Sequence, residues 1–178
     1  MSKALIIIDL QNDYFPGGKF TLVNIKEASE NAAKVLKYAR ENGIKVIHVR
    51  HESLKSNAPL FEKGTSGTII NSVVQPLESE VVITKNHPNS FLGTNLSDEL
   101  GDIKDLIIVG AMTNICIQGT TRHASEIGYN VTVVSDAVTT RDFEFDGVVV
   151  PAKYVHASTL ATLAFGYASI VKTEDIVY

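Results

Sequence analysis

The chain has 178 residues, a length that suits a single domain spanning residues 1–178 with a full-sized core. Apolar residues make up 44% and charged residues 20%, and a net charge of −4 argues against a nucleic-acid or anionic-membrane partner. The single cysteine excludes an internal disulfide and fits a reducing compartment. The sequence contains no run of about 18 apolar residues, the length that a membrane span requires. We therefore expect a cytoplasmic globular protein.

The first predicted element is a strand at Ala4–Ile8, a continuous run of apolar, mostly β-branched residues. Such a run is typical of strands buried on both faces, as in parallel sheets covered by helices. Asp9 follows directly, and the carboxyl ends of such strands are where α/β sheets bind ligands. The alternative for Asp9 is that it only caps the following loop, which Pro16–Gly18 marks.

A helix is predicted over Asn24–Asn42, because apolar residues recur at three- and four-residue steps. Asn24 with Glu27 resembles a capping box, and Gly43 is a suitable stop. The next strand is predicted at Ile44–Val49, followed closely by His51. Two histidines three residues apart on a strand point to opposite faces and cannot easily share a metal, so we interpret His48 as a core or interface residue.

Residues Ser53–Ser72 are polar and glycine-rich, which indicates a long surface loop, with a lid or a subunit contact as its two candidate roles. A short strand follows at Val81–Thr84, and Lys85 stands at its end. The alternative to a functional role for Lys85 is an ordinary solvent-facing charge. Farther along, Thr94 or Asn95 is expected to cap a helix that runs to Leu100.

The region around the only cysteine is a predicted strand, Leu106–Val109, broken at Gly110 and followed by a helix. With Thr113 or Asn114 as its cap, Cys116 falls in the first turn of this helix. There, unpaired N–H groups and a partial positive charge favour a thiolate and can bind an oxyanion. The alternative is that Cys116 is one more small buried apolar residue.

The remaining elements continue the alternation of strands and helices. A strand is predicted at Asn130–Ser135, ending at Asp136, then a helix at Pro151–Phe165 and a last short strand at Ser169–Val171. This order predicts a three-layer α/β/α domain with a mainly parallel sheet and right-handed crossovers.

Three chemically distinct side chains stand at equivalent places, each just after a predicted strand: Asp9, Lys85 and Cys116. Because the carboxyl ends of parallel strands share one edge of a sheet, we expect these side chains to converge. An acid, a base and a nucleophile are complementary chemistry, so the pattern indicates a nucleophilic enzyme.

The chain resembles the isochorismatase-like cysteine hydrolases, a family that includes nicotinamidases and N-carbamoylsarcosine amidases. The resemblance lies in three segments: LIIIDLQNDYF, ITKNHPNSFLGTNL and IIVGAMTNICIQGTTRHASEIGYNVTVVSDA. It implies a six-stranded parallel sheet, an Asp–Lys–Cys triad at Asp9, Lys85 and Cys116, and a cis peptide at Ala111–Met112.

The resemblance also implies hydrolysis of a C–N bond in a small amide, ureide or carbamoyl compound, with water as the second substrate. Lys85 and the helix N-terminus would favour the Cys116 thiolate, and Asp9 would take the thiol proton and pass it to the leaving amine. The backbone N–H groups of Met112 and Cys116 would hold the oxyanion of a reaction that passes through a thioester. Phe15, Phe91, Ala111 and Ile115 are candidates to line the substrate pocket, with plain packing as the alternative.

Two departures narrow this expectation. Metal-dependent nicotinamidases carry an Asp-x-His pair after the second strand, whereas this region reads HVRHESLKSNAPLFEKG, so we predict no metal or other cofactor and doubt nicotinamide as the substrate. Isochorismatases act on a vinyl ether and often lack the cysteine, so Cys116 favours C–N cleavage. A vinyl-ether hydrolase and a binding or assembly protein without turnover remain alternatives.

The family resemblance also suggests a homodimer or homotetramer, with residues Ser53–Ser72 and the later predicted loop Asp142–Val150 at its contacts. His87 and His123 are assigned either a substrate contact or an ordinary surface position.

Overall fold

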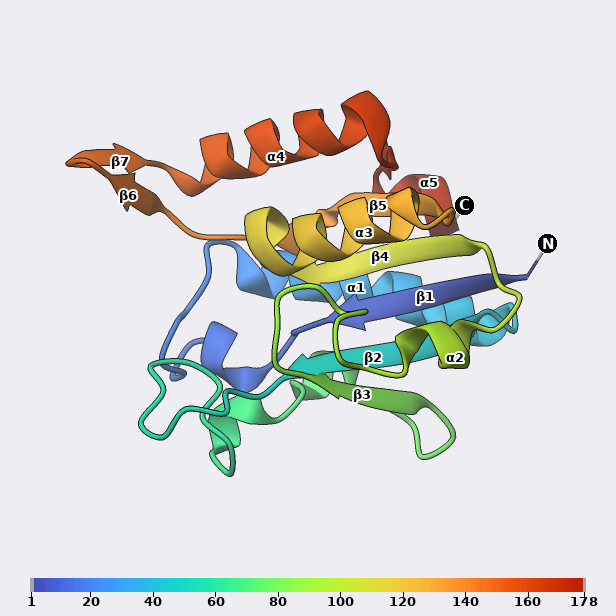
Figure 1. Cartoon of the computed structure of the whole chain (residues 1–178), viewed down its shortest axis with the longest axis horizontal. Coiled ribbons are helices and arrows are strands. Elements are labelled where there is room, and N and C mark those ends of the chain that lie inside the picture. The colour runs from blue at the N-terminus through green and yellow to red at the C-terminus, as the bar shows by residue number, and fades with distance from the viewer. Residues whose placement is uncertain (1, 178) are drawn as a thin grey trace.

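Six parallel strands form the centre of the computed structural model, which describes residues 2–177. The strand order in the sheet is β3-β2-β1-β4-β5-β8, and every neighbouring pair is parallel (Figure 1). This confirms the predicted fold class. The strands are β1 (Lys3–Ile8), β2 (Lys45–His51), β3 (Val81–Lys85), β4 (Asp105–Ala111), β5 (Asn130–Thr139) and β8 (Ser169–Val171).

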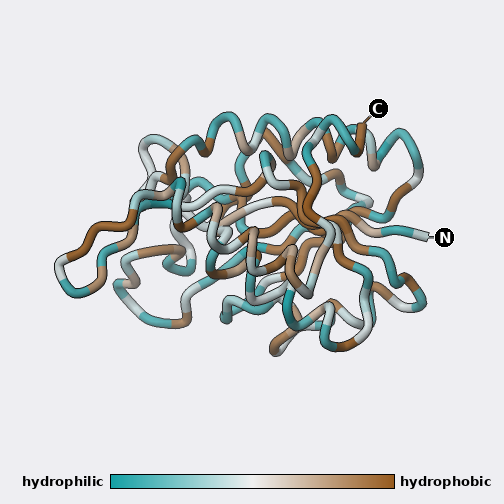
Figure 2. The backbone as a smooth tube through the Cα atoms, turned by 90° about the horizontal axis from the view of Figure 1, so that it is seen from above, coloured by the Kyte–Doolittle hydropathy of each residue, from teal (hydrophilic) through white to brown (hydrophobic). Residues whose placement is uncertain are grey.

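Helices cover both faces of this sheet. Helices α1 (Ile25–Glu41) and α5 (Thr173–Val177) lie on one face, and α2 (Leu96–Leu100), α3 (Gln118–Glu126) and α4 (Ala152–Gly166) lie on the other. Each face has its own apolar cluster, to which β1 contributes alternate residues: Leu5 and Ile7 to one, Ile6 and Ile8 to the other. Burial on both faces is the physical reason for the unbroken apolar run in β1, and Figure 2 shows the central strands as the most hydrophobic part of the trace.

The register brings the carboxyl ends of the central strands to one edge. Ile8 of β1 lies beside Val49 of β2 and Gly110 of β4, and His51 at the end of β2 pairs with Lys85 at the end of β3. Segments that are far apart in the sequence therefore meet at this edge.

Strands β4 and β5 both continue past their predicted ends. Strand β4 continues through Gly110, where its register with β5 shifts, and β5 continues past Asp136 to Thr139. Gly110 does not end the strand: its φ of 126° and its closeness to Ile8 let the chain stay paired there. Asp136 does not end β5 either, and its carboxylate instead accepts hydrogen bonds from the backbone and hydroxyl of Thr173.

The predicted capping box at the start of α1 is wrong. Asn24 has left-handed backbone angles, φ 52° and ψ 26°, and its side chain makes no capping hydrogen bond. Its carbonyl oxygen accepts from Ala28 N at 3.0 Å. The short helix α2 begins after Asn95, which occupies the predicted cap position but makes no side-chain capping hydrogen bond.

The long loop between β2 and β3 is less exposed than its composition suggested. It contains the single 3-10 turns η2 (Ser66–Thr68) and η3 (Ser72–Val74), and Phe61 is almost fully buried. The Phe61 ring packs edge-on against Tyr14 of η1 (Asn12–Tyr14), with 4.7 Å between ring centroids. The first part of the loop therefore packs against the segment that follows β1.

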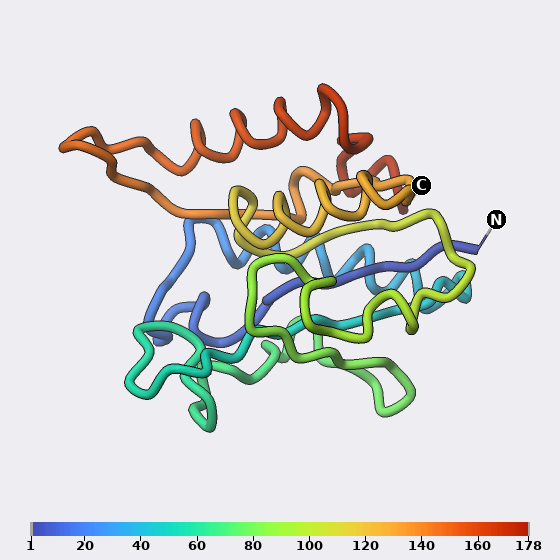
Figure 3. Tube along the Cα trace, viewed as in Figure 1, coloured from blue at the N-terminus to red at the C-terminus, as the bar shows by residue number. Residues whose placement is uncertain are grey.

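The region predicted as a loop at Asp142–Val150 is a β-hairpin, formed by β6 (Phe143–Phe145) and β7 (Val148–Val150). It projects from the body of the molecule before the chain turns back into α4 (Figure 3). Between residues 2 and 177, we find no helix with the length and apolar character that crossing a lipid bilayer requires.

Candidate active site

Asp9 is the first residue beyond β1 and is fully buried. Its backbone has a φ of 53°, and its N–H donates to the carbonyl of Val49 at 2.9 Å, which holds the turn against β2. One carboxylate oxygen, Oδ2, accepts from Lys85 Nζ at 2.7 Å. The other, Oδ1, is buried and has no hydrogen-bond partner among residues 2–177, so it is free to accept a proton.

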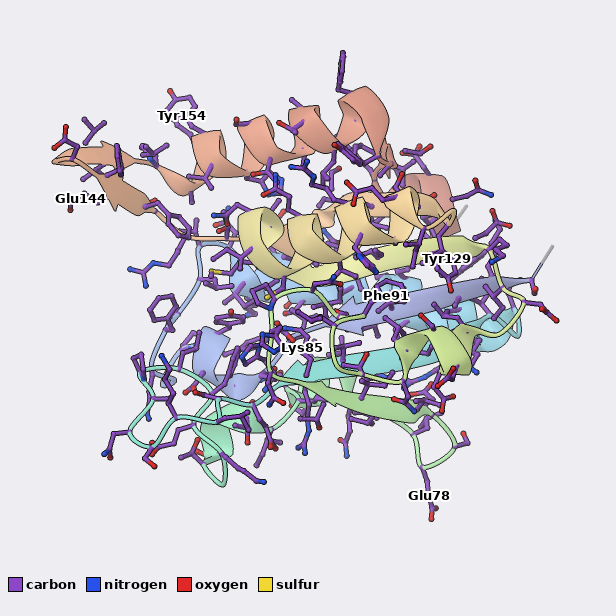
Figure 4. All side chains as sticks on the ribbon, in the orientation of Figure 1. Glu78, Lys85, Phe91, Tyr129, Glu144 and Tyr154 are labelled. Atoms are coloured by element: carbon purple, nitrogen blue, oxygen red, sulfur yellow. The ribbon has the colours of Figure 1, made fainter. Side chains whose placement is uncertain are left out.

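Lys85 ends β3 and points into the molecule rather than into solvent (Figure 4). Its ammonium donates to Asp9 Oδ2, to Cys116 Sγ at 3.4 Å and to His51 Nδ1 at 3.0 Å. Burial alone would lower the pKa of Lys85, but Asp9 and the Cys116 sulfur outweigh it and raise the pKa above its ordinary value. The lysine is therefore a charged ammonium at the centre of the cluster.

Cys116 lies in a π-helical turn, Thr113–Ile117, that leads directly into α3. The predicted caps are wrong, because Met112 occupies the cap position and neither Thr113 nor Asn114 caps the turn. The side chains of Thr113 and Asn114 instead anchor the turn to other parts of the chain. Thr113 Oγ1 lies 3.0 Å from Nδ1 of His156 in α4, and Asn114 Oδ1 accepts from Thr140 at 2.6 Å.

The expectation of a resting thiolate is also wrong. Burial raises the pKa of the Cys116 thiol, the negative charge of Asp9 raises it further, and the opposing effect of Lys85 is smaller. Ionising the thiol would add a second negative charge to a buried site in which Asp9 and Lys85 already balance. The resting arrangement is therefore a thiol beside a carboxylate and an ammonium.

The segment before Cys116 carries the predicted oxyanion donors. The peptide bond between Ala111 and Met112 is cis. The Met112 carbonyl oxygen accepts from the N–H groups of Ile115 and Ile117, at 3.0 and 3.2 Å, whereas the intervening Cys116 N–H does not share this acceptor. The Cys116 N–H is therefore a first-turn donor that is not bonded to the Met112 carbonyl oxygen.

His51 is a residue of this cluster to which the sequence assigned no role. The predicted strand ended at Val49, but β2 extends two residues farther and places His51 at the same sheet edge as Lys85. The signal that could have found it is the one that found Asp9 and Lys85, a polar residue at the end of a buried strand. His48 faces the opposite way and is buried against Glu80, which confirms its interpretation as a core residue.

Gln11 and Tyr14 also support the site. The Gln11 side chain donates to the carbonyls of His51 and Thr68 and accepts from His51 N–H, so it fastens the end of β2 to the loop. Burial raises the pKa of the Tyr14 hydroxyl well above its ordinary value, and the negative charge of the nearby Asp9 raises it further. Tyr14 is therefore a neutral phenol next to the cluster.

The predicted pocket residues are placed in different surroundings. Ala111 is buried at the end of β4, and Ile115 is half-buried between the two apolar clusters, beside Cys116. Phe15 is half-buried in the loop after β1. Phe91 packs its ring against those of His123 and Tyr129, with centroids 5.3 and 5.6 Å away, as the packing alternative predicted.

The other candidate groups are outside the cluster. His87 is exposed, and His123 is half-buried beside Phe91. Among the residues that the structure describes, no set of three or more histidine, cysteine or carboxylate side chains is grouped so that it could hold a metal ion.

Known proteins resemble this chain in both sequence and structure. Residues 3–150 match the family model described as the isochorismatase domain. The chain is 43% identical to the uncharacterized isochorismatase family protein YddQ of Bacillus subtilis, over 98% of each chain. It is 28% identical to nicotinamidase 3 of Arabidopsis thaliana, over 97% of this chain and 86% of that one. The crystal structure of a putative isochorismatase hydrolase from Oleispira antarctica superposes with a TM-score of 0.96, at 43% identity, covering 99% of this chain and 96% of that one.

Proposed function

The chain belongs to the isochorismatase family, and we propose that it is a cysteine hydrolase that cleaves the C–N bond of a small amide, ureide or carbamoyl compound. The observation that carries this proposal is the buried contact of Lys85 Nζ with both Asp9 Oδ2 and Cys116 Sγ. The names of relatives support the reaction class: nicotinamidase 3 and, at 26% identity over 75% of this chain, the ureidoacrylate amidohydrolase RutB of Agrobacterium fabrum.

In the first step, the Cys116 sulfur attacks the carbonyl carbon of the substrate and its proton passes to Asp9, whose Oδ1 is free to take it. The charge of the site is then conserved. One negative charge moves from the Asp9 carboxylate to the substrate oxyanion, and the Lys85 ammonium stays beside it. A buried site tolerates this transfer better than it would tolerate a thiolate formed in addition to the Asp9 carboxylate.

The developing oxyanion is held by the backbone N–H groups of Met112 and Cys116. The first turn of a helix offers such donors without a competing acceptor, and losing one donor of this kind typically costs about 2.7–4 kcal/mol of transition-state stabilisation. The protonated Asp9 then gives its proton to the nitrogen, the C–N bond breaks, and an amine or ammonia leaves. A thioester with Cys116 remains.

Water completes the reaction. Asp9 removes a proton from it, the resulting hydroxide attacks the thioester carbonyl, and the C–S bond breaks as Asp9 returns the proton to the Cys116 sulfur and the acid product leaves. Lys85 remains an ammonium throughout, as its raised pKa requires. Ile115, half-buried beside Cys116, is the predicted pocket residue whose position fits substrate contact best, whereas Ala111 is fully buried at the end of β4.

The test is a panel of small primary amides, ureides and carbamoyl compounds, assayed for release of ammonia with and without a metal chelator. We expect turnover of at least one compound, insensitivity to the chelator, and loss of turnover in Cys116→Ala. The control is the circular dichroism spectrum and melting temperature of that variant. Turnover of a vinyl ether that survives Cys116→Ser would instead select an ether hydrolase.

A further inference from the structure

The Lys85 ammonium has three N–H bonds and three acceptors within hydrogen-bond distance. Asp9 Oδ2 is at 2.7 Å, His51 Nδ1 at 3.0 Å and Cys116 Sγ at 3.4 Å. An ammonium is always a donor, so the His51 nitrogen that faces it must carry a lone pair and no proton. The contact with His51 therefore constrains both the direction of the Lys85 ammonium and the protonation of the imidazole ring.

His51 is itself held in place by three kinds of contact. Its backbone is in β2, paired with Lys85 of β3. Gln11 bonds to both its N–H and its carbonyl oxygen, at 2.7 and 2.9 Å. Its ring lies beside that of Phe61, with centroids 5.8 Å apart and planes inclined by 32°. Because the position of His51 is fixed in this way, its ring can orient the Lys85 ammonium.

We propose that His51 is a positioning residue of this site: its neutral imidazole accepts the third N–H of Lys85 through Nδ1 and aims the ammonium at Asp9 and Cys116. The inference rests on the proposed function and deepens it by adding a fourth side chain that acts through Lys85. The ring proton then resides on Nε2, because a neutral imidazole that accepts at one nitrogen donates at the other.

The surroundings of His51 keep the ring neutral near pH 7. The charged and titratable groups that act on it are Lys85 from β3, Asp9 from the end of β1 and His87 from the loop after β3. Burial lowers the pKa of His51 and Lys85 lowers it further, while Asp9 opposes them. Protonation at acid pH would remove the acceptor and set a cation against the ammonium. Activity should therefore fall on the acid side, with a midpoint below about pH 6.5.

Substitution separates positioning from simple packing. In His51→Asn the amide oxygen can occupy the position of Nδ1 but does not titrate, whereas His51→Leu provides no acceptor. We expect His51→Leu to lower kcat by about 10- to 100-fold with KM changed less than about threefold. His51→Asn should restore most of kcat and abolish the acid limb of the pH profile, and His87→Asn, the matched control, should retain that limb.

A second measurement does not depend on turnover. Nitrogen-15 chemical shifts of labelled histidine report the protonation of each ring nitrogen, and the His51 signals are identified by their loss in His51→Asn. We expect Nδ1 without a proton and Nε2 with one at about pH 7. An Nδ1–H tautomer, a charged ring at pH 7, or His51→Leu with unchanged kcat and pH profile would overturn the inference. If no compound shows Cys116-dependent turnover, that result counts against the proposed function. The tautomer of His51 then tests the positioning role by itself.

Discussion

At the scale of single residues, the site depends on charge balance in a place without solvent. Asp9 and Lys85 are both buried, and removing one member of such a pair typically costs about 3–5 kcal/mol because the other charge is left unpaired. That balance explains why Cys116 rests as a thiol. The proton must leave with the attack on substrate rather than before it.

The reactivity of Cys116 can be measured without substrate. Thiolates are the reactive form, so the raised pKa predicts that alkylation by iodoacetamide still accelerates as the pH rises above about 9. The rate is measured by intact mass, and the only cysteine in the chain makes the product unambiguous. At about pH 9 we expect alkylation more than about tenfold slower than in the urea-unfolded chain.

The unfolded chain is the control, because its thiol titrates at the ordinary value of about 8.5. Limited access alone would slow the reaction equally at every pH, so the shape of the profile separates the two causes. A rate that levels off below about pH 8 would contradict a raised pKa.

The residues of the cluster were predictable to different degrees. Asp9, Lys85 and Cys116 follow apolar runs that the sequence displays openly, so their convergence at one edge could be expected. The protonation of Cys116 could not, because it depends on how deeply the group is buried and on its distance from Asp9. His51 was missed because its strand continues beyond the apolar run that predicted it.

At the scale of elements, the junction of β1 with β4 needs a glycine. A Cβ at position 110 would lie 2.0 Å from the carbonyl oxygen of Ile8, and the φ of 126° is one that side chains with a Cβ rarely adopt. This close approach lets β4 carry its chain on to Ala111 and Met112.

We therefore predict that Gly110→Ala lowers the free energy of unfolding by at least about 3 kcal/mol in urea titrations. Gly128→Ala is the matched control. Gly128 also has a positive φ, but a Cβ there would meet no atom within 4 Å, so we expect a loss of about 1 kcal/mol. Equal losses in the two variants would show that the contact with Ile8 is unimportant.

A second element-scale feature connects β2, α1 and the loop before β3. Glu80 accepts from Arg40 at 2.7 Å and lies 3.0 Å from Nε2 of the buried His48. Burial alone would raise the pKa of Glu80, but the bonds from Arg40, Leu77 N–H and His48 lower it to about 2. Burial also lowers the pKa of His48, so its neutral form is favoured in the folded state.

Both shifts predict stability that decreases with acid. Protonation of unfolded His48 begins to cost folding free energy below about pH 6.5, and the contribution of Glu80 is complete above about 4.5 and is lost as the pH falls toward 2. We expect Glu80→Gln to lose about 1–3 kcal/mol at pH 7 in urea titrations. The difference from the wild type should shrink between pH 4.5 and 2.5, and a constant difference would contradict a lowered pKa.

Element types were predictable here and element ends were not. Apolar runs and three- to four-residue spacing identified the six strands and the larger helices. Strand ends depend on backbone pairing with neighbours, which is why β4, β5 and β2 continue into polar or glycine positions. The π-helical turn at Cys116 is bonded to His156 and Thr140, which lie far along the chain and cannot be paired with it from the local sequence.

At the scale of the whole molecule, one part lies outside the three layers. The β6–β7 hairpin carries Phe145 and Val148 at 83% and 62% exposure, and α4 behind it exposes Tyr154 (Figure 4). A two-stranded hairpin is marginal in water without a further surface to pack on. The homo-oligomer predicted from the sequence would provide that surface.

We predict a homodimer or homotetramer in sedimentation velocity experiments, shifted toward the monomer by the double substitution Phe145→Ser and Val148→Ser. Leu54→Ser changes an equally exposed side chain in the other segment predicted at contacts, Ser53–Ser72, and serves as the comparison. Because that segment already packs its buried Phe61 against Tyr14 in the same chain, we expect Leu54→Ser to alter the sedimentation coefficient less. A monomeric wild-type protein would contradict the prediction.

Intact mass after rapid acid quenching tests most directly whether Cys116 forms a covalent thioester with its substrate. The protein is mixed with the amide that the panel shows to be hydrolysed, quenched within the first turnovers and weighed. We predict a mass increase equal to the acyl group on the wild-type chain and none on Cys116→Ala. Turnover in both proteins with no adduct on either would contradict the account.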